Sequence, residues 1–271
     1  MVACQLEATS CAISPATALP PLERLTSHGP PLRQPLPFLA HRRLDRILCR
    51  SVSALAQRRI ARVEGIERLH PRYDPFVLAL NHNQRLEAVL VPTLLIFARG
   101  GKQIHFLADW NFLMVPFIGL LFRRNQAVIV GSKSAKPRFL NLLKPLLVPR
   151  GSPLRRAQRR LLTGHSIGVF PEGTVNRDDR VLLPGHPGAA ALALSTGTPL
   201  IPAGIRFPGH RPGTPIGEWE AMEIHIGEPI PTPTPTPRSR PERARVWELH
   251  HQLMNAISAL CGKRVPGAVG A

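Results

Sequence analysis

Short apolar runs alternate with longer, helically spaced apolar segments along most of the chain. The short runs predict strands, and the longer segments predict helices. Strands are expected at residues 76–80, 104–107, 127–130, 166–170, 200–205 and 221–226. Helices are expected at residues 87–98, 136–147, 153–163, 188–195 and 243–260. This alternation predicts a single α/β domain with a central mixed or mostly parallel sheet flanked by helices.

A basic amphipathic helical segment is expected before this domain, over residues 39–64. Its apolar positions recur at helical spacing: Leu44, Ile47, Leu48, Val52 and Leu55. Seven arginines surround them: Arg42, Arg43, Arg46, Arg50, Arg58, Arg59 and Arg62. Such a helix can lie in the headgroup region of an anionic membrane. It can equally pack its apolar stripe on the core of the domain, and the pattern does not separate the two.

The remaining boundaries follow from composition. Residues 1–38 are rich in Pro, Ser and Thr and are expected to be a disordered tail. Residues 65–262 form the expected folded domain, which contains a stiff Pro-Thr connector at 229–237. Residues 263–271 are expected to be a flexible C-terminus. No apolar run reaches the ~18–20 residues of a transmembrane helix, and the N-terminus does not resemble a signal peptide. A peripheral position on the cytoplasmic face of a membrane is therefore expected.

The chain is strongly basic, with 35 Lys and Arg against 17 Asp and Glu, a formal net charge of +18. This excess predicts attraction to an anionic membrane, phosphorylated substrates or nucleic acid. Only 5% of residues are aromatic, and no nucleic-acid motif is present, so no specific nucleic-acid partner is expected. The four cysteines form no CxxC pair and the histidines form no ligand cluster, which indicates no metal site and a reducing compartment.

Candidate chemistry follows the first predicted strand, in the block from Asn81 to Glu87. Open α/β sheets place reacting groups beyond the carboxyl ends of their strands. His82 would lie on the turn, and Glu87 would reach back from the next helix to accept the imidazole N–H. The other ring nitrogen could then take a proton. Taken alone, a histidine in this place is more often a capping or core residue.

A second candidate follows the strand at 166–170, where Pro171 and Glu172 lead to Gly173 and Thr174. The backbone of Gly173 and the hydroxyl of Thr174 can face a ligand oxygen, with the acid of Glu172 beside them. An ordinary strand-to-loop turn explains the same residues.

Together the two blocks resemble the glycerolipid acyltransferase family, whose best-known members are 1-acyl-glycerol-3-phosphate acyltransferases. That family carries Asn-His-x4-Asp and, later, Phe-Pro-Glu-Gly-Thr. Here they stand as Asn81-His82-x4-Glu87 and Phe170-Pro171-Glu172-Gly173-Thr174. Further stretches are similar to the family and extend the likeness over residues 63–260: Pro116–Gly119, Arg177-Asp178, Gly188–Ala190, Leu200–Ile205 and Ile226–Ile230.

Three positions depart from the family pattern. Glu87 replaces the usual Asp and is one methylene longer. Gln126 and Ser132 stand where the family has Gly-x5-Arg, so the phosphate-binding arginine is missing, with Lys133 next to it. Val175 stands where an Arg often follows the second block. The last two departures bear on the headgroup of the acceptor.

The resemblance implies direct acyl transfer from acyl-CoA or acyl-ACP to a lysophospholipid hydroxyl, most simply lysophosphatidic acid to phosphatidic acid. His82 would be the base and Glu87 its orienting partner, with no further cofactor. Gly173 and neighbouring amides would stabilise the oxyanion, and Glu172 and Thr174 would bind the acceptor. Pro202 would line the acyl or donor side. Candidate phosphate contacts are Arg123, Arg124, Lys133 and Arg177.

Two other functions remain open. The missing arginine suits an acyltransferase for a different lyso-lipid or amino-lipid. The charge also permits a basic, non-catalytic protein that binds a membrane or nucleic acid.

Overall fold

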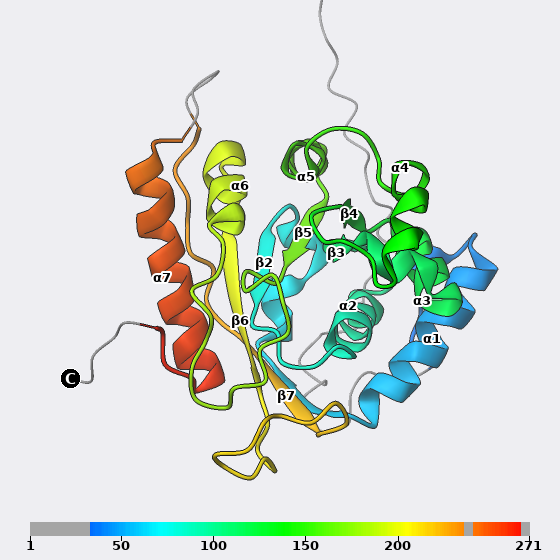
Figure 1. Cartoon of the computed structure of the whole chain (residues 1–271), viewed down its shortest axis with the longest axis horizontal. Coiled ribbons are helices and arrows are strands. Elements are labelled where there is room, and N and C mark those ends of the chain that lie inside the picture. Colours follow the sequence, from blue (N-terminus) through cyan, green and yellow to red (C-terminus); the bar gives the residue numbers. More distant parts are fainter. Residues whose placement is uncertain (1–32, 236–240, 267–271) are drawn as a thin grey trace, which may run out of the picture.

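A seven-stranded sheet lies between two layers of helices (Figure 1). The structure, a computed structural model, describes residues 33–235 and 241–266. The strands are β1 (Ile60–Glu64), β2 (Val77–Leu80), β3 (Ile104–Asp109), β4 (Val128–Val130), β5 (Ser166–Val169), β6 (Leu200–Arg206) and β7 (Met222–Ile226). Their order is β1-β7-β6-β2-β5-β3-β4. Neighbouring strands are parallel except β6 and β7.

The helices divide between the two faces of the sheet. They are α1 (Arg43–Gln57), α2 (Glu87–Ala98), α3 (Pro116–Arg124), α4 (Lys144–Leu147), α5 (Pro153–Leu162), α6 (Gly188–Thr196) and α7 (Arg243–Cys261). The 3-10 helices are η2 (Pro37–Leu39), η3 (Ile66–Leu69), η4 (Pro71–Tyr73), η5 (Trp110–Met114) and η6 (Arg138–Leu143). In Figure 1, α1, α2 and α3 lie on one side of the sheet, and α6 and α7 lie on the other.

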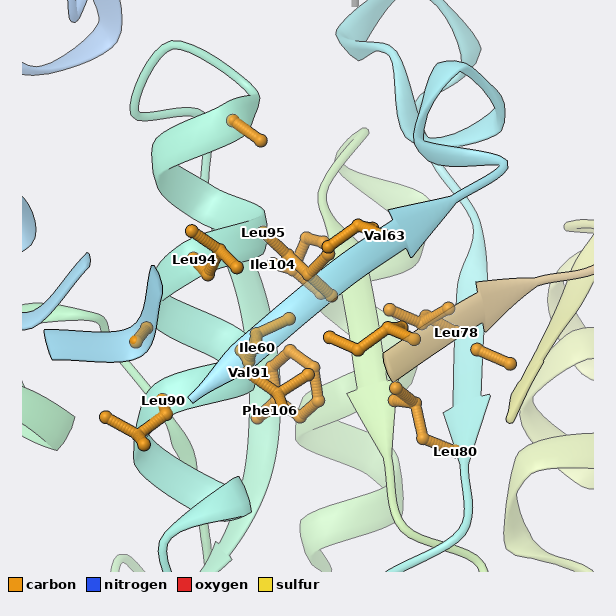
Figure 2. Packing of buried hydrophobic residues seen from close by; sticks show 14 of the residues in the cluster. Ile60, Val63, Leu78, Leu80, Leu90, Val91, Leu94, Leu95, Ile104 and Phe106 are labelled. Atoms are coloured by element: carbon orange, nitrogen blue, oxygen red, sulfur yellow. The ribbon is translucent and has the colours of Figure 1, made fainter. Parts of the chain in front are cut away.

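The alternation of side chains along β2 builds both layers. Leu78 and Leu80 join the core cluster that contains α2, whereas Val77 and Ala79 join the cluster that contains α6 and α7. Figure 2 shows the first cluster, where side chains of α2 pack against β1, β2 and β3. Helix α2 is apolar on all sides because α1 covers its outer side.

The predicted α/β fold is confirmed, and each of the six predicted strands is present within one or two residues. Strand β1 was missed. Residues 39–64 were predicted to be one helical segment, but α1 ends at Gln57 and Ile60–Glu64 pairs with β7 at the sheet edge. The predicted helix over 136–147 is a 3-10 helix, η6, followed by the single turn of α4.

Helix α1 divides its apolar residues between the core and the surface. Cys49, Val52 and Ala56 are buried, whereas Leu44 and Ile47 are exposed. The predicted stripe therefore packs only partly on the domain. Among the described residues, no helix has both the length and the apolar character needed to cross a bilayer.

Both predicted flexible ends need correction where the structure describes them. Residues 1–32 and 267–271 lie outside the described residues. Gln34 and Leu36, assigned to the tail, are buried, and the Gln34 side chain donates to the carbonyl of Phe97. At the other end, Lys263 is buried and Arg264 forms a β-bridge with Val181. The domain therefore extends beyond both predicted boundaries, because these residues find partners in distant segments.

Candidate functional site

A histidine–carboxylate pair lies beyond the carboxyl end of β2. His82 Nδ1 is 3.0 Å from Glu87 Oε2. The Glu87 side chain is fully buried at the first turn of α2, where the helix dipole favours a negative charge. Because a carboxylate oxygen only accepts, Nδ1 carries the proton and Nε2 remains the basic nitrogen. His82 lines a large cleft. The pair can therefore take a proton from a group bound there.

Asn83 holds the Glu87 carboxylate in place. Its backbone N–H donates to Oε2 at 2.6 Å and its side-chain amide donates to Oε1 at 3.1 Å. Asn81 fastens the start of the same loop to β6, since its side chain exchanges two hydrogen bonds with the backbone of Ile205. These contacts fix the loop that carries His82, and they explain why asparagine flanks the histidine on both sides.

Glu172 joins this loop to the loop that follows β5. Its carboxylate accepts from the His82 N–H at 3.0 Å, from the Asn176 side chain at 2.8 Å and from the Leu183 N–H at 2.9 Å. Glu172 is only 4% exposed and does not line the cleft. The structure thus places this predicted acceptor ligand behind the site, where it positions the backbone of His82.

The cleft beside His82 has a volume of about 1440 Å³, above the ~300–1,000 Å³ of ordinary small-molecule sites. One part is apolar and runs between α2, β3 and α3. Its walls are Val89, Pro92, Ile96, Ile104, Phe106, Leu121 and Phe122. The other part is polar and basic, with Arg85, Lys133, Lys136 and Arg177. This division suits ligands that combine a long apolar chain with an anionic head.

The turn after β5 brings Gly173 and Thr174 to the wall of the cleft. Gly173 has φ of +67°, a conformation that favours glycine. Its own N–H is used inside the turn, donating to Phe170 O at 3.0 Å, so it is not free for a ligand. The N–H groups of Thr174 and Val175 have no protein acceptor within the described chain, and both residues line the cleft. These two amides can therefore donate to a bound ligand.

Of the four predicted phosphate contacts, Lys133 and Arg177 reach the cleft. Lys133 Nζ donates to Gly173 O at 2.9 Å, and Arg177 is paired with Glu218. Arg123 and Arg124 do not line the cleft. Arg124 instead pairs with Asp45 and so joins α3 to α1. Arg85 and Lys136 were missed by sequence reasoning, although Arg85 stands within the histidine block.

Pro202 is also away from the cleft. It lies buried in the middle of β6, in register with Ala79 of β2, and its carbonyl accepts from Gly227 N at 2.8 Å. The prediction that Pro202 lines the acyl or donor side is not met, because a residue in a central strand faces the helix layers.

Lys263 is a further residue that sequence reasoning missed. Its ammonium donates to the side-chain oxygen of Asn83 and to Asp178 O at 2.5 Å, and the residue is 4% exposed. Burial lowers the pKa of Lys263, while the nearby carboxylates, Glu172 foremost, oppose this shift. A chain of contacts thus runs from Lys263 through Asn83 and Glu87 to His82. The sequence offers no signal for it, since 180 positions separate Lys263 from Asn83.

The described residues contain no group of three or more His, Cys, Asp or Glu side chains that could hold a metal ion.

Fold and site together define an α/β protein that presents a carboxylate-oriented histidine to a deep, partly apolar cleft. Comparison with known proteins identifies the family. The family model described as Acyltransferase matches residues 60–206, more than half of the chain. The chain belongs to this family, as its two blocks predicted.

Named relatives and one solved structure are consistent with this assignment. The chain is 29% identical over 140 residues to a chloroplastic 1-acyl-sn-glycerol-3-phosphate acyltransferase of Brassica napus, covering 52% of this chain and 35% of the relative. It is 24% identical over 160 residues to the 1-acyl-sn-glycerol-3-phosphate acyltransferase of Bacillus subtilis, covering 59% and 69%. The crystal structure of the acyltransferase PlsC from Thermotoga maritima matches with a TM-score of 0.53 at 19% identity, covering 82% of this chain and 84% of that one. At 19% identity, the similarity to the Thermotoga structure shows a shared fold alone. The chain spans only about a third of the length of the Brassica relative.

Proposed function

We propose that this protein transfers a fatty-acyl group from an acyl thioester to a hydroxyl of a lysophospholipid. The observation that carries the proposal is the 3.0 Å contact between His82 Nδ1 and Glu87, made at the wall of a cleft with one apolar and one basic part. The names of the relatives support the same reaction.

In this mechanism His82 Nε2 removes the hydroxyl proton of the acceptor as that oxygen attacks the thioester carbonyl. Glu87 orients the ring and stabilises the imidazolium that forms. The N–H groups of Thr174 and Val175 donate to the developing oxyanion. The carbon–sulfur bond then breaks, and the imidazolium protonates the departing thiolate. A new ester and a free thiol result, and no covalent enzyme intermediate is needed.

The apolar part of the cleft would hold the acyl chain. Burying one methylene contributes about 0.8 kcal/mol, so a long chain bound along Val89, Ile96 and Phe106 is held without polar contacts. The thioester would come from acyl-CoA or acyl-ACP, and the reaction requires no further cofactor. This position leaves the basic part of the cleft for phosphate groups.

The proposed acceptor is lysophosphatidic acid, with phosphatidic acid as the product and phospholipid biosynthesis as the role. Lys133 and Arg177 are the proposed contacts to its phosphate. Because Gln126 and Ser132 replace the family's Gly-x5-Arg, an acceptor without a phosphate monoester is the second candidate. A peripheral position on an anionic, cytoplasmic membrane face is proposed for the protein, since its acceptor resides in a bilayer.

The test is acyl transfer to lysophosphatidic acid by the wild type and by His82→Ala, with both donor types. We expect the variant to lose about two to four orders of magnitude in turnover, because the base is removed. Unchanged secondary structure by circular dichroism controls for folding. Near-wild-type turnover in a folded His82→Ala protein would rule out the mechanism. Turnover by the wild type only with phosphate-free acceptors would favour the second candidate.

A further inference from the structure

A protruding segment next to the cleft exposes an unusual number of large apolar side chains. It comprises η6 and α4, residues 138–147. Phe139 is 67% exposed, Leu142 81% and Leu146 82%, and Leu143 is also exposed. Their spacing of three and four residues puts them on one face of a helical segment. We call these four side chains the apolar ridge.

The apolar ridge lies beside the wall of the cleft. Lys133, Lys136 and Leu140, just before and within the segment, line the cleft. Behind the ridge, Leu146 shares a second groove with Arg123 of α3, and Figure 1 shows α4 beside α3 at the margin of the molecule. A ligand that leaves the surface contacted by the ridge therefore has a short route to His82.

The segment of the chain that carries the ridge is basic. Residues 110–171 contain eleven Lys and Arg and no Asp or Glu. Lys136, Arg138 and Arg150, close to the ridge in sequence, are exposed. Basic side chains near an anionic bilayer contribute about 1 kcal/mol each, and apolar side chains between them can enter the acyl boundary. This combination complements an anionic lipid surface.

We propose that the apolar ridge inserts into an anionic membrane and sets the cleft entrance against the bilayer. An acidic protein partner would match the basic residues, but it would not account for leucines more than 80% exposed. The inference deepens the proposed function, on which it rests for the need to draw a lipid acceptor from a membrane. It adds a membrane contact separate from α1, next to the part of the cleft lined by Lys133, Lys136 and Leu140.

Flotation of the full chain with phosphatidylcholine vesicles, with and without phosphatidylglycerol, tests the ridge directly. We expect the double variant Leu142→Ser/Leu146→Ser to bind anionic vesicles at least about tenfold more weakly than the wild type. We expect Arg138→Gln/Arg150→Gln to reduce the preference for phosphatidylglycerol. Unaltered binding by the double serine variant would overturn the proposal.

Leu162→Ser is the matched control. Leu162 is 66% exposed, but it ends α5 shortly before the amino end of β5, at the edge of the sheet opposite the cleft. Its replacement should change vesicle binding by less than about twofold, because it removes an exposed apolar side chain that lies away from the ridge. An equal loss in this control would contradict a specific role of the ridge.

Two other partners could cover the ridge, a second copy of the chain or an acidic carrier protein, and further measurements distinguish them from a membrane. If the ridge joins two copies, sedimentation without lipid will show a dimer that the double serine variant loses. If it binds an acidic carrier protein, that variant will lose acyl carrier protein binding and keep vesicle binding. Either result would overturn the proposal.

Turnover separates this inference from the proposed function. With a detergent-dispersed acceptor, the double serine variant should retain wild-type activity, since neither leucine lines the cleft. If the wild type shows no acyl transfer but the variant loses vesicle binding, the membrane role of the ridge is supported and the proposed function is wrong. If both proteins transfer acyl groups and bind vesicles equally, the membrane role of the ridge is wrong and the proposed function is supported.

Discussion

At the scale of single residues, the site is a line of buried polar contacts that ends at one basic nitrogen. Lys263 contacts Asn83, Asn83 contacts Glu87, and Glu87 contacts His82. Buried polar groups in such a line are costly to leave unpaired, at about 1–3 kcal/mol each. Each member therefore restricts the geometry of the next. Lys263 does not line the cleft, so any role it has is to position the others.

Replacement of Lys263 by methionine tests that role. We expect kcat to fall about tenfold, because an unpaired Asn83 oxygen lets the Glu87 contact relax. Loss of a nearby cation also favours the imidazolium, so the acidic limb of the kcat/KM profile should move to higher pH. The measurement is the pH dependence of turnover, with Lys263→Arg as the charge-preserving control. A lower melting temperature with an unchanged pH profile would mean that Lys263 only supports the fold.

Glu87 allows a second comparison at this scale. Glu87→Asp keeps the charge and should retain more activity than Glu87→Gln, because only a carboxylate both fixes the Nδ1 proton and stabilises the imidazolium. Turnover of both variants is to be measured beside circular dichroism. Equal losses would show that the charge of Glu87 does not matter.

At the scale of elements, parallel pairing of β2 with β5 brings the two motif loops together. Their carboxyl ends meet at one edge of the sheet, which is where open α/β sheets bind ligands. Glu172 then connects the loops directly, through the N–H of His82. A second junction, between β3 and α5, lies away from the cleft. There Arg160 approaches His105 Nδ1 at 2.6 Å.

The β3–α5 junction predicts a pH dependence of stability. Burial, together with the charge of Arg160, lowers the pKa of His105 from 6.5 to about 4. As the pH falls below 6.5, the unfolded chain binds a proton that the folded chain excludes, so stability is lost between about 6.5 and 4. We expect His105→Gln to flatten this part of the profile in urea denaturation. An unchanged slope would exclude His105 as its source.

At the scale of the whole molecule, charge is distributed unevenly. The net charge is +18. The stretch without acidic residues, 110–171, carries the apolar ridge and supplies Lys133 and Lys136 to the basic part of the cleft. Acidic residues concentrate in other parts of the chain, where several pair with arginines, as Asp45 does with Arg124. The segment that carries the apolar ridge is therefore the part of the chain expected to attract an anionic surface most strongly.

This distribution predicts a salt effect on membrane binding. Raising ionic strength from 0.15 M to 1 M shortens the Debye length from about 8 Å to about 3 Å. Binding to phosphatidylglycerol vesicles should weaken strongly, whereas turnover with a detergent-dispersed, phosphate-free acceptor should change little. Flotation and turnover across a salt series measure both. Salt-independent vesicle binding would show that charge does not contribute.

The sequence by itself determined the α/β fold, the expected elements and the His82–Glu87 pair. These features depend on neighbours in the chain: apolar periodicity sets the strands and helices, and a spacing of five lets Glu87 reach back to His82. Helix α1, which lies wholly within the predicted helical segment 39–64, was predicted for the same reason. Strand β1 was not, because Ile60–Glu64 is a strand at the sheet edge only through its pairing with β7.

Only the tertiary structure decided which candidate side chains serve the cleft. Lys133 and Arg177 reach it, whereas Arg124 is paired with Asp45, Pro202 is buried in β6, and Glu172 is enclosed by protein donors. Lys263 enters from a segment that composition marked as flexible. Burial and hydrogen-bond partners depend on contacts between segments far apart in the chain, and local pattern carries no information about those contacts.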